Sequence, residues 1–317
     1  MPGYTLDDGL TVKNKLGATS HSALEIAEAD YVRNRLLQME LGHGPTGQFD
    51  AAHLKAIHHH LFQDVYEWAG HTRDERVALS DGTIATEPLL RKMDGSAFMA
   101  GPMIPEALDR IAGSLRAANY LCGLPREEFA RRAADVMVDL NGVHPFREGN
   151  GRTQRVFMRA LATEAGHELD FAIVSRERMI QASIAGNDRG DNAMMRRMFD
   201  EISDPVRVAA LEKAIEALSE HKFPWNDNYL ATAEPGHKIE VTMAGVAGDQ
   251  FMARTSTEIL IAQTSDLPTP RPQRGDTFML VPSVWGETRD AAKDRTEQVP
   301  PRDPPAGRPR GRGGRGR

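Results

Sequence analysis

The chain has 317 residues, of which 40% are hydrophobic and 26% charged, as expected of a soluble globular protein. It contains no apolar segment near the roughly 20 residues of a membrane helix, and its first residues lack the pattern of a secretory signal, so we expect a cytoplasmic protein without a membrane span. The net charge of −6 is uneven, because residues 301–317 contain six Arg and one Asp and carry +5, which leaves −11 for the rest. An acidic body of this kind argues against bulk nucleic-acid binding, whereas the basic tail leaves local binding open.

The first 204 residues have the pattern of a mainly helical domain. Apolar residues recur at helical spacing in 22–39, and Asp50 is a suitable N-cap for a helix that ends near Gly70. Asp81-Gly82 predicts a hairpin over 78–87. Further helices are predicted before Asn141-Gly142, over 153–165 and over 176–201 with an interruption at 186–190; the first of these carries an apolar stripe: Phe129, Ala133, Val136 and Leu140.

The second part of the chain has a different character. Residues 205–234 are expected to form a helical linker, with one helix over 206–221. Three β-prone segments, 237–243, 251–262 and 277–282, lie between turn residues and predict a small β module over 235–286. Residues 287–317 are polar and then rich in Pro, Gly and Arg, which is typical of disorder.

One segment between two predicted helices carries the composition of an anion site. It reads His-Pro-Phe-Arg-Glu-Gly-Asn-Gly-Arg-Thr-Gln-Arg over 144–155. Gly149, Asn150 and Gly151 would expose backbone N–H groups at a helix start, where the helix dipole also favours an anion. Arg152 and Arg155 are three residues apart and suit phosphate.

Three other side chains of this segment, those of His144, Phe146 and Glu148, also have expected roles at the anion site. Glu148 would repel a phosphate unless Mg²⁺ bridges the two, so a metal site is expected there. Histidine has an unperturbed pKa of about 6.5, which suits His144 as a general base near neutral pH. Phe146 is apolar in a polar run and is expected to anchor the loop to the core. The alternative is an ordinary glycine turn with solvated arginines, which the combination of all these residues disfavours.

The segment matches the Fic-domain signature HxFx(D/E)GNGRxxR at every fixed position. Residues 11–17, 54–62 and 65–70 also resemble the family, so the resemblance covers about 4–204. It implies a helical fold with a β-hairpin flap and transfer of AMP from Mg-ATP to a Tyr, Ser or Thr hydroxyl of a target protein. By position, His144 would be the base, Glu148 would hold Mg²⁺, and residues 149–152 would bind the phosphates. Arg155 would hold the γ-phosphate.

The resemblance also implies how the target and the nucleotide base are held. The hairpin over 78–87 would be the flap, with Thr83, Ile84 and Ala85 pairing with the target segment. Asn187, in the predicted interruption after the motif helix, would border the adenine. The β module over 235–286 resembles the OB-type domain that follows the catalytic domain in some members.

The resemblance to the Fic family also implies how the activity would be inhibited. The family's inhibitory (S/T)xxxE(G/N) motif has no match in a suitable place. We therefore expect a toxin-like enzyme inhibited in trans by a small antitoxin that supplies a glutamate to Arg155. A different nucleotide stays open, as does a nucleic-acid-associated adaptor that acts through the β module and the tail. Export by a type IV-like system, with the basic tail as signal, is the alternative to a cytoplasmic location.

Overall fold

A computed structural model describes residues 3–91 and 97–286. The chain divides into two compact units. The first, here called the helical unit, contains the residues up to Thr232 together with Ser256–Leu260. The second, here called the β unit, contains Ala233–Thr255 and the residues from Ile261 onward. The predicted disordered and nucleic-acid-binding tail, 287–317, lies outside the described residues.

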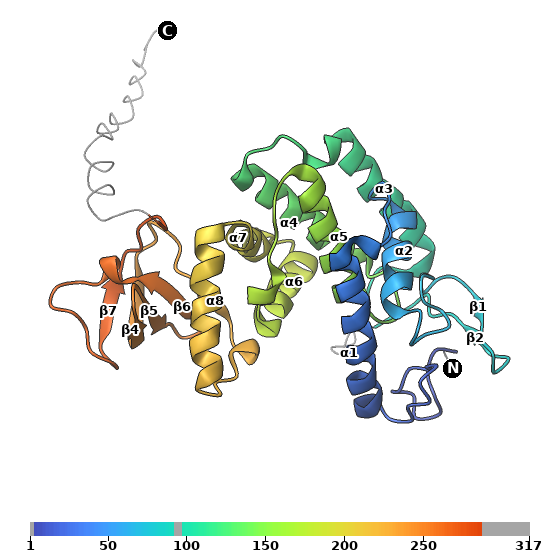
Figure 1. The fold of residues 1–317 in the computed structure, drawn as a ribbon. Coiled ribbons are helices and arrows are strands. Elements are labelled where there is room, and N and C mark those ends of the chain that lie inside the picture. Colours follow the sequence, from blue (N-terminus) through green and yellow to red (C-terminus); the bar gives the residue numbers. More distant parts are fainter. Residues whose placement is uncertain (1–2, 92–96, 287–317) are drawn as a thin grey trace, which may run out of the picture. The chain divides into compact units, whose positions relative to one another are not determined.

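All the α-helices of the described ranges belong to the helical unit (Figure 1). They are α1 (His21–Gln38), α2 (Ala51–Phe62), α3 (Ile104–Ala117), α4 (Arg126–Val143), α5 (Asn150–Ala165), α6 (Arg176–Arg189), α7 (Ala193–Ile202) and α8 (Pro205–Glu220). A π-helical turn over Met39–His43 extends α1. The region is thus mainly helical as predicted, but the helix that follows Asp50 ends at Phe62 and not near Gly70, because residues 63–70 form turns. No described helix combines the length and apolarity needed to cross a membrane.

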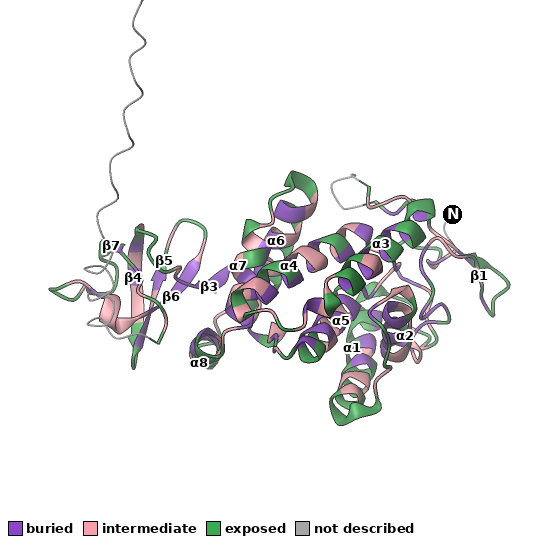
Figure 2. Cartoon of the chain, turned by 90° about the horizontal axis from the view of Figure 1, so that it is seen from above, coloured by how far each residue is buried: buried purple, intermediate pink, exposed green. Residues whose placement is uncertain are grey.

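The core of the helical unit is built around α4, which packs against α3, α5, α6 and α7. Three alanines, Ala130, Ala133 and Ala134, are fully buried and let neighbouring helices approach closely. Buried residues line α2, α4 and α5, and α5 packs against both of the other two helices (Figure 2). The predicted apolar stripe is only partly right. Val136 is half-buried, whereas Met137 and Val138 are buried, because α4 has neighbours on several sides.

The helix pair α6 and α7 corrects the predicted interruption at 186–190. The helix α6 continues through Gly186 to Arg189, and its C-cap, Gly190, has a φ of 68°. A Cβ on Gly186 would lie 3.0 Å from Val138 of α4, so this glycine permits close packing of two helices. The predicted break is therefore confined to the few residues between Arg189 and Ala193.

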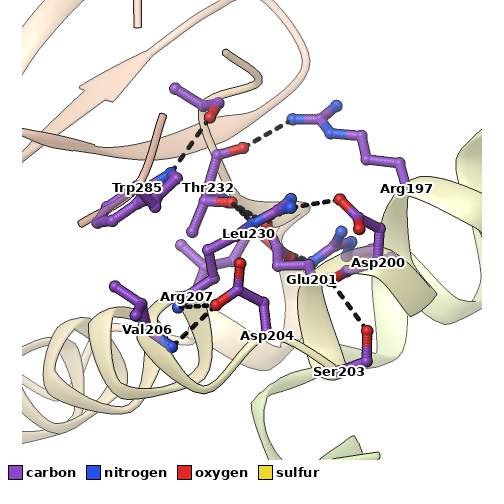
Figure 3. Close-up of polar contacts among 12 residues, drawn as sticks. Arg197, Asp200, Glu201, Ser203, Asp204, Val206, Arg207, Leu230, Thr232 and Trp285 are labelled. Carbon is purple, nitrogen blue, oxygen red and sulfur yellow. Dashed lines mark hydrogen bonds and ion pairs between the residues drawn. The ribbon is translucent and has the colours of Figure 1, made fainter. Parts of the chain in front are cut away.

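A buried ionic network joins α6, α7, α8 and the segment after them (Figure 3). Glu201 is fully buried and forms an ion pair with Arg178, and a second with Arg207 at 3.5 Å. The backbone N–H of Thr232 donates to Glu201 at 2.6 Å. Because two arginines compensate one carboxylate, α8 and the residues up to Thr232 are held to the helical unit.

The strands form a two-stranded hairpin and a five-stranded sheet. The hairpin pairs β1 (Val77–Ala78) with β2 (Ile84–Ala85). The sheet has the order β3-β6-β5-β4-β7. Its strands are β3 (Leu230–Thr232), β4 (Ile239–Ala247), β5 (Gln250–Arg254), β6 (Ile259–Gln263) and β7 (Thr277–Leu280). Within the β unit, β4 pairs antiparallel with β5 and β7, and a bulge lies between Met243 and Gly245.

The prediction of three β segments was incomplete. Residues 251–262 contain parts of two strands, because the polar residues 255–258 separate β5 from β6. The short strand β3 lies in the segment predicted as a linker. It was missed because three residues are too short for a period-2 pattern to emerge. Five strands is the number found in OB-type barrels, and that resemblance stays a prediction.

Candidate functional site

The loop between α4 and α5 carries the residues that the sequence singled out. His144 ends α4 in a left-handed conformation, with a φ of 47° and a ψ of 61°. Its carbonyl accepts a hydrogen bond from Nε of Arg73 at 2.9 Å. Its ring is stacked on Phe98, with centroids 3.8 Å apart and planes at 11°. The main chain and the ring of His144 are therefore both held from outside the motif.

The Asn150 side chain closes the loop on itself. Its Oδ1 accepts from the N–H of Phe146 at 2.9 Å, and its Nδ2 donates to the carbonyl of Phe146 at 2.8 Å. Both polar atoms are thus used within the loop, and Asn150 is buried. Only the backbone N–H of Asn150 can serve an anion. The prediction that Asn150 binds phosphate is thus limited to its backbone N–H.

The glycines and the first arginine of the predicted anion site lie at the start of α5. Gly149 is the N-cap with a φ of 82°, and a Cβ there would lie 2.4 Å from the Phe62 ring. The positive φ and the close Phe62 ring both favour glycine at position 149. The carboxylate of Glu148 accepts from the N–H of Gly149 at 2.9 Å and lies 3.4 Å from Nη2 of Arg152. The helix start and Arg152 thus hold an anionic oxygen of the protein itself, so the same donors suit a phosphate oxygen.

The two motif arginines have different surroundings. Arg152 forms ion pairs with Glu28 and Glu148, and its guanidinium lies 4.8 Å from the centre of the Phe62 ring. Arg155 is half-buried and has no carboxylate partner within the part of the chain that the structure describes. Burial, followed by the charge of Arg152, lowers the pKa of Arg155. Arg155 is therefore a cation left available for an anionic ligand.

Phe146, the residue expected to anchor the loop, is buried against a histidine that the sequence did not assign to the site. Phe146 is 1% exposed, and its ring is stacked on His58 with centroids 3.9 Å apart. Nδ1 of His58 accepts from the N–H of Gly70 at 2.8 Å, so Nε2 carries the proton and donates to the carbonyl of Glu148 at 3.0 Å. Burial lowers the pKa of His58 to about 3. This imidazole is a neutral brace beneath the loop.

The hairpin is present where the flap was predicted, with a longer turn. The N–H of Leu79 donates to the carbonyl of Thr83, so Ser80, Asp81 and Gly82 form a three-residue turn in place of a two-residue one. The side chains of Asp81 and Thr83 bond to each other and extend the turn.

The predicted docking residues differ in exposure. Thr83 and Ile84 are exposed, whereas the side chain of Ala85 is buried. A Cβ on Gly3 would lie 1.8 Å from the carbonyl oxygen of Ile84, so the N-terminal segment lies against this strand. Lys13 donates to both Asp81 and Thr83 at 2.7 Å. The hairpin is therefore held in place by residues before α1.

Asn187 lies near the motif loop. A Cβ on Gly142 would lie 3.2 Å from its Oδ1, which places Asn187 beside the last turn of α4, two residues before His144. It belongs to α6 and not to a loop, because that helix extends to Arg189.

Sequence reasoning missed several supporting residues. Arg73 is fully buried and donates to the carbonyls of His144, Pro88 and Met99, which ties the base of the flap to the motif loop. His58, Phe98 and Lys13 were also not assigned to the site. No periodicity marks these residues, because each acts through a neighbour that is distant in the chain. Within 3–91 and 97–286, no three His, Cys, Asp or Glu residues are clustered as metal ligands.

Known proteins resemble this chain over much of its length. The family model "Fic/DOC family" matches residues 48–162. A protein adenylyltransferase of Bartonella henselae is 34% identical over 267 residues, which cover 84% of this chain and 49% of that protein. The chain thus spans about half the length of that relative.

Two solved structures support the same assignment. The type IV secretion system effector protein BepA has a TM-score of 0.81 at 31% identity, and covers 90% of this chain and 97% of its own. The N-terminal Fic domain of a Bartonella quintana effector, solved with bound ADP, has a TM-score of 0.61 at 37% identity and covers 65% of this chain and 97% of its own. The chain therefore belongs to the Fic/DOC family.

Proposed function

We propose that the protein transfers AMP from Mg-ATP to a Tyr, Ser or Thr hydroxyl of a target protein and releases pyrophosphate. The observation that carries this proposal is the helix start of α5, where the N–H of Gly149 and the guanidinium of Arg152 already hold a carboxylate oxygen, in the loop and helix start that follow His144. The adenylyltransferase name of the Bartonella henselae relative and the ADP in the Bartonella quintana structure support an adenine nucleotide.

The proposed reaction assigns one task to each group. His144 accepts the proton of the target hydroxyl, whose oxygen attacks the α-phosphorus. The bond between the α-phosphorus and the bridging oxygen breaks, and pyrophosphate leaves with its electron pair. Backbone N–H groups of residues 149–151 and the Arg152 guanidinium stabilise the charge, while Arg155 binds the γ-phosphate and orients the α-phosphate. Such a transfer depends mainly on positioning and charge stabilisation.

Glu148 fits the role of the Mg²⁺ ligand. Its carboxylate is a hard oxygen donor, its side chain is 42% exposed, and it lies beside the anion site. Mg²⁺ is commonly held by one or two carboxylates together with substrate phosphates and water, so a single protein carboxylate suffices. When bound, the ion would neutralise phosphate charge. Glu148 would leave the N–H of Gly149 as the phosphate arrives.

We further propose that the flap aligns the target by main-chain pairing along Thr83, Ile84 and Ala85. The exposed Thr83 and Ile84 and the bracing by Lys13 support this, because a pre-ordered edge reduces the entropy lost on docking. Asn187, beside the end of α4, is proposed to border the adenine.

Regulation in trans is also a proposal. Arg155 has no carboxylate partner in the described ranges, so a small antitoxin that supplies a glutamate to Arg155 would compete directly with the γ-phosphate. The likeness to BepA supports an alternative to a cytoplasmic location, namely export by a type IV-like system.

The experiment is a label-transfer assay. The purified protein is incubated with bacterial lysate, Mg²⁺ and, separately, α-labelled ATP, UTP, GTP and CTP, with His144→Ala as the control. We expect a labelled protein band from ATP that requires His144. Label from another nucleotide would change the donor but keep the mechanism. Absence of label from all four nucleotides, in a preparation shown by mass spectrometry to contain no bound inhibitor, would contradict the proposal for targets present in that lysate.

A further inference from the structure

Glu28 is a buried carboxylate in the apolar face of α1. The buried residues of this helix are Leu24, Glu28 and Val32, spaced four apart, so the glutamate occupies the centre of the stripe that packs on the core. Its exposed fraction is only 5%. Burial of a carboxylate is costly unless a charge and hydrogen bonds compensate it. The partners of Glu28 are Tyr66 and the motif residue Arg152.

The two oxygens of Glu28 have different partners. Oε2 accepts a hydrogen bond from the hydroxyl of Tyr66, and Oε1 pairs with Nη1 of Arg152. Tyr66 is 2% exposed and is stacked on Trp68, with ring centroids 4.4 Å apart. Burial and then the charge of Glu28 raise the pKa of Tyr66, so its hydroxyl remains a donor. The carboxylate is thus fixed on one side before it meets the arginine.

The guanidinium of Arg152 is held in three directions. Glu28 binds Nη1, the Phe62 ring lies under the plane at 4.8 Å, and Nη2 lies 3.4 Å from the carboxylate of Glu148. A guanidinium is a rigid planar fork, so fixing one nitrogen and one face determines where the other nitrogen points. Here Nη2 points to the oxygen that also accepts from the N–H of Gly149.

We propose that Glu28 is a positioning residue of the nucleotide site, which holds Arg152 so that Nη2 faces the place of the phosphates. This inference rests on the proposed function, since it takes Arg152 as a phosphate ligand. It extends the site to α1, outside the residues 48–162 that match the family model. If Glu28 only repelled the phosphates, or kept Arg152 away from them, its charge would weaken nucleotide binding instead of strengthening it.

The test is a double-mutant cycle on nucleotide affinity. The Kd for Mg²⁺ and the non-hydrolysable ATP analogue AMPPNP is measured calorimetrically for the full chain, Glu28→Gln, Arg152→Ala and the double variant. Gln keeps the shape of Glu28 but removes its charge. Glu25→Gln, an exposed glutamate of the same helix, is the matched control. Helical circular dichroism during thermal unfolding verifies that each variant is folded.

We expect Glu28→Gln to weaken AMPPNP binding on the order of tenfold, as for outer residues that orient a ligand-binding group. In the Arg152→Ala background the same change should cause no further weakening, because the arginine to be positioned is gone. Glu25→Gln should bind like the unmodified chain. Tyr66→Phe, which removes one support of the carboxylate, should weaken binding by a smaller factor.

Three results would overturn the inference. Unchanged or tighter binding by Glu28→Gln would mean that Glu28 does not position Arg152. Equal weakening in both backgrounds would mean a general structural role. Failure of the unmodified chain to bind AMPPNP would reject both this inference and the proposed function. If the chain binds AMPPNP and the cycle behaves as expected, but no nucleotide yields a His144-dependent label, only the proposed transfer is rejected.

Discussion

His58 should make the helical unit sensitive to mild acid. The residue is fully buried beneath the motif loop and is neutral in the folded chain. Burial is the main cause that lowers its pKa to about 3, and the nearby charge of Arg152 lowers it further. In the unfolded chain the pKa returns to about 6.5. Between these values the unfolded state therefore binds one more proton at this position than the folded state does.

The sign and magnitude follow from proton linkage. Because the unfolded state takes up the extra proton, the free energy of unfolding falls as the pH falls below 6.5. One pKa unit corresponds to about 1.4 kcal/mol, so lowering the pH from 6.5 to 4.5 should remove about 2 to 3 kcal/mol through this residue alone. Protonation of Nδ1 would also deprive the N–H of Gly70 of its acceptor. The loop that carries His144 should loosen in the same pH range.

The measurement compares the full chain with His58→Gln in urea at pH 4.5, 5.5, 6.5 and 7.5. Helical circular dichroism reports on the helical unit, since every described α-helix belongs to it. Glutamine can still accept from Gly70 and donate to Glu148. We expect this variant to be less stable than the unmodified chain at pH 7.5, with a difference that shrinks as the pH falls. His21→Gln, a change at an exposed histidine, is the control and should follow the unmodified chain.

Parallel stability curves for the full chain and His58→Gln, with a constant difference from pH 7.5 to 4.5, would refute this reasoning. Such a result would mean that His58 is protonated in the folded state or that its environment opens before it titrates. A difference that grows as the pH falls would contradict the sign of the argument.

Four further changes test other parts of the structure. Phe146→Ala should lower the free energy of unfolding by about 3–5 kcal/mol, because the ring is buried, and an unchanged melting temperature would contradict that. Glu201→Gln should cost about 3–5 kcal/mol in urea unfolding at pH 7, since it leaves the buried Arg178 without its carboxylate partner and Arg207 with Asp200 alone, whereas the exposed Glu212→Gln should be neutral. Burial by itself raises the pKa of Glu201, but Arg178 and Arg207 outweigh it and hold that pKa below its usual value. The ionised Glu201 therefore stabilises the folded chain above about pH 4.3, and this contribution is lost as the pH falls through the pKa of Glu201 in the folded state. Lys13→Ala should reduce target labelling several-fold while leaving the Kd for AMPPNP unchanged, and an equal loss of both would argue against a flap-bracing role. Arg155→Ala should lower turnover roughly a hundredfold because the γ-phosphate is no longer held, and equal turnover would remove its assigned role.

The helices and the motif loop could be predicted from local pattern. Helix periodicity and the N-cap at Asp50, which accepts from the N–H of His53, depend on residues close in the chain. The strands were harder. Residues 251–262 were read as one segment although they contain parts of β5 and β6, because their division depends on partners in the sheet and not on composition.

The sequence by itself determined the chemistry of residues 144–155, since a helix end, a glycine turn and a helix start place neighbouring residues around one point. Only the tertiary structure decided what holds that point in place. Glu28 from α1, His58 from α2 and Arg73 before the flap contact the motif across 71 to 124 positions of chain. Contacts at such separations arise from the packing of whole elements, which no local period encodes.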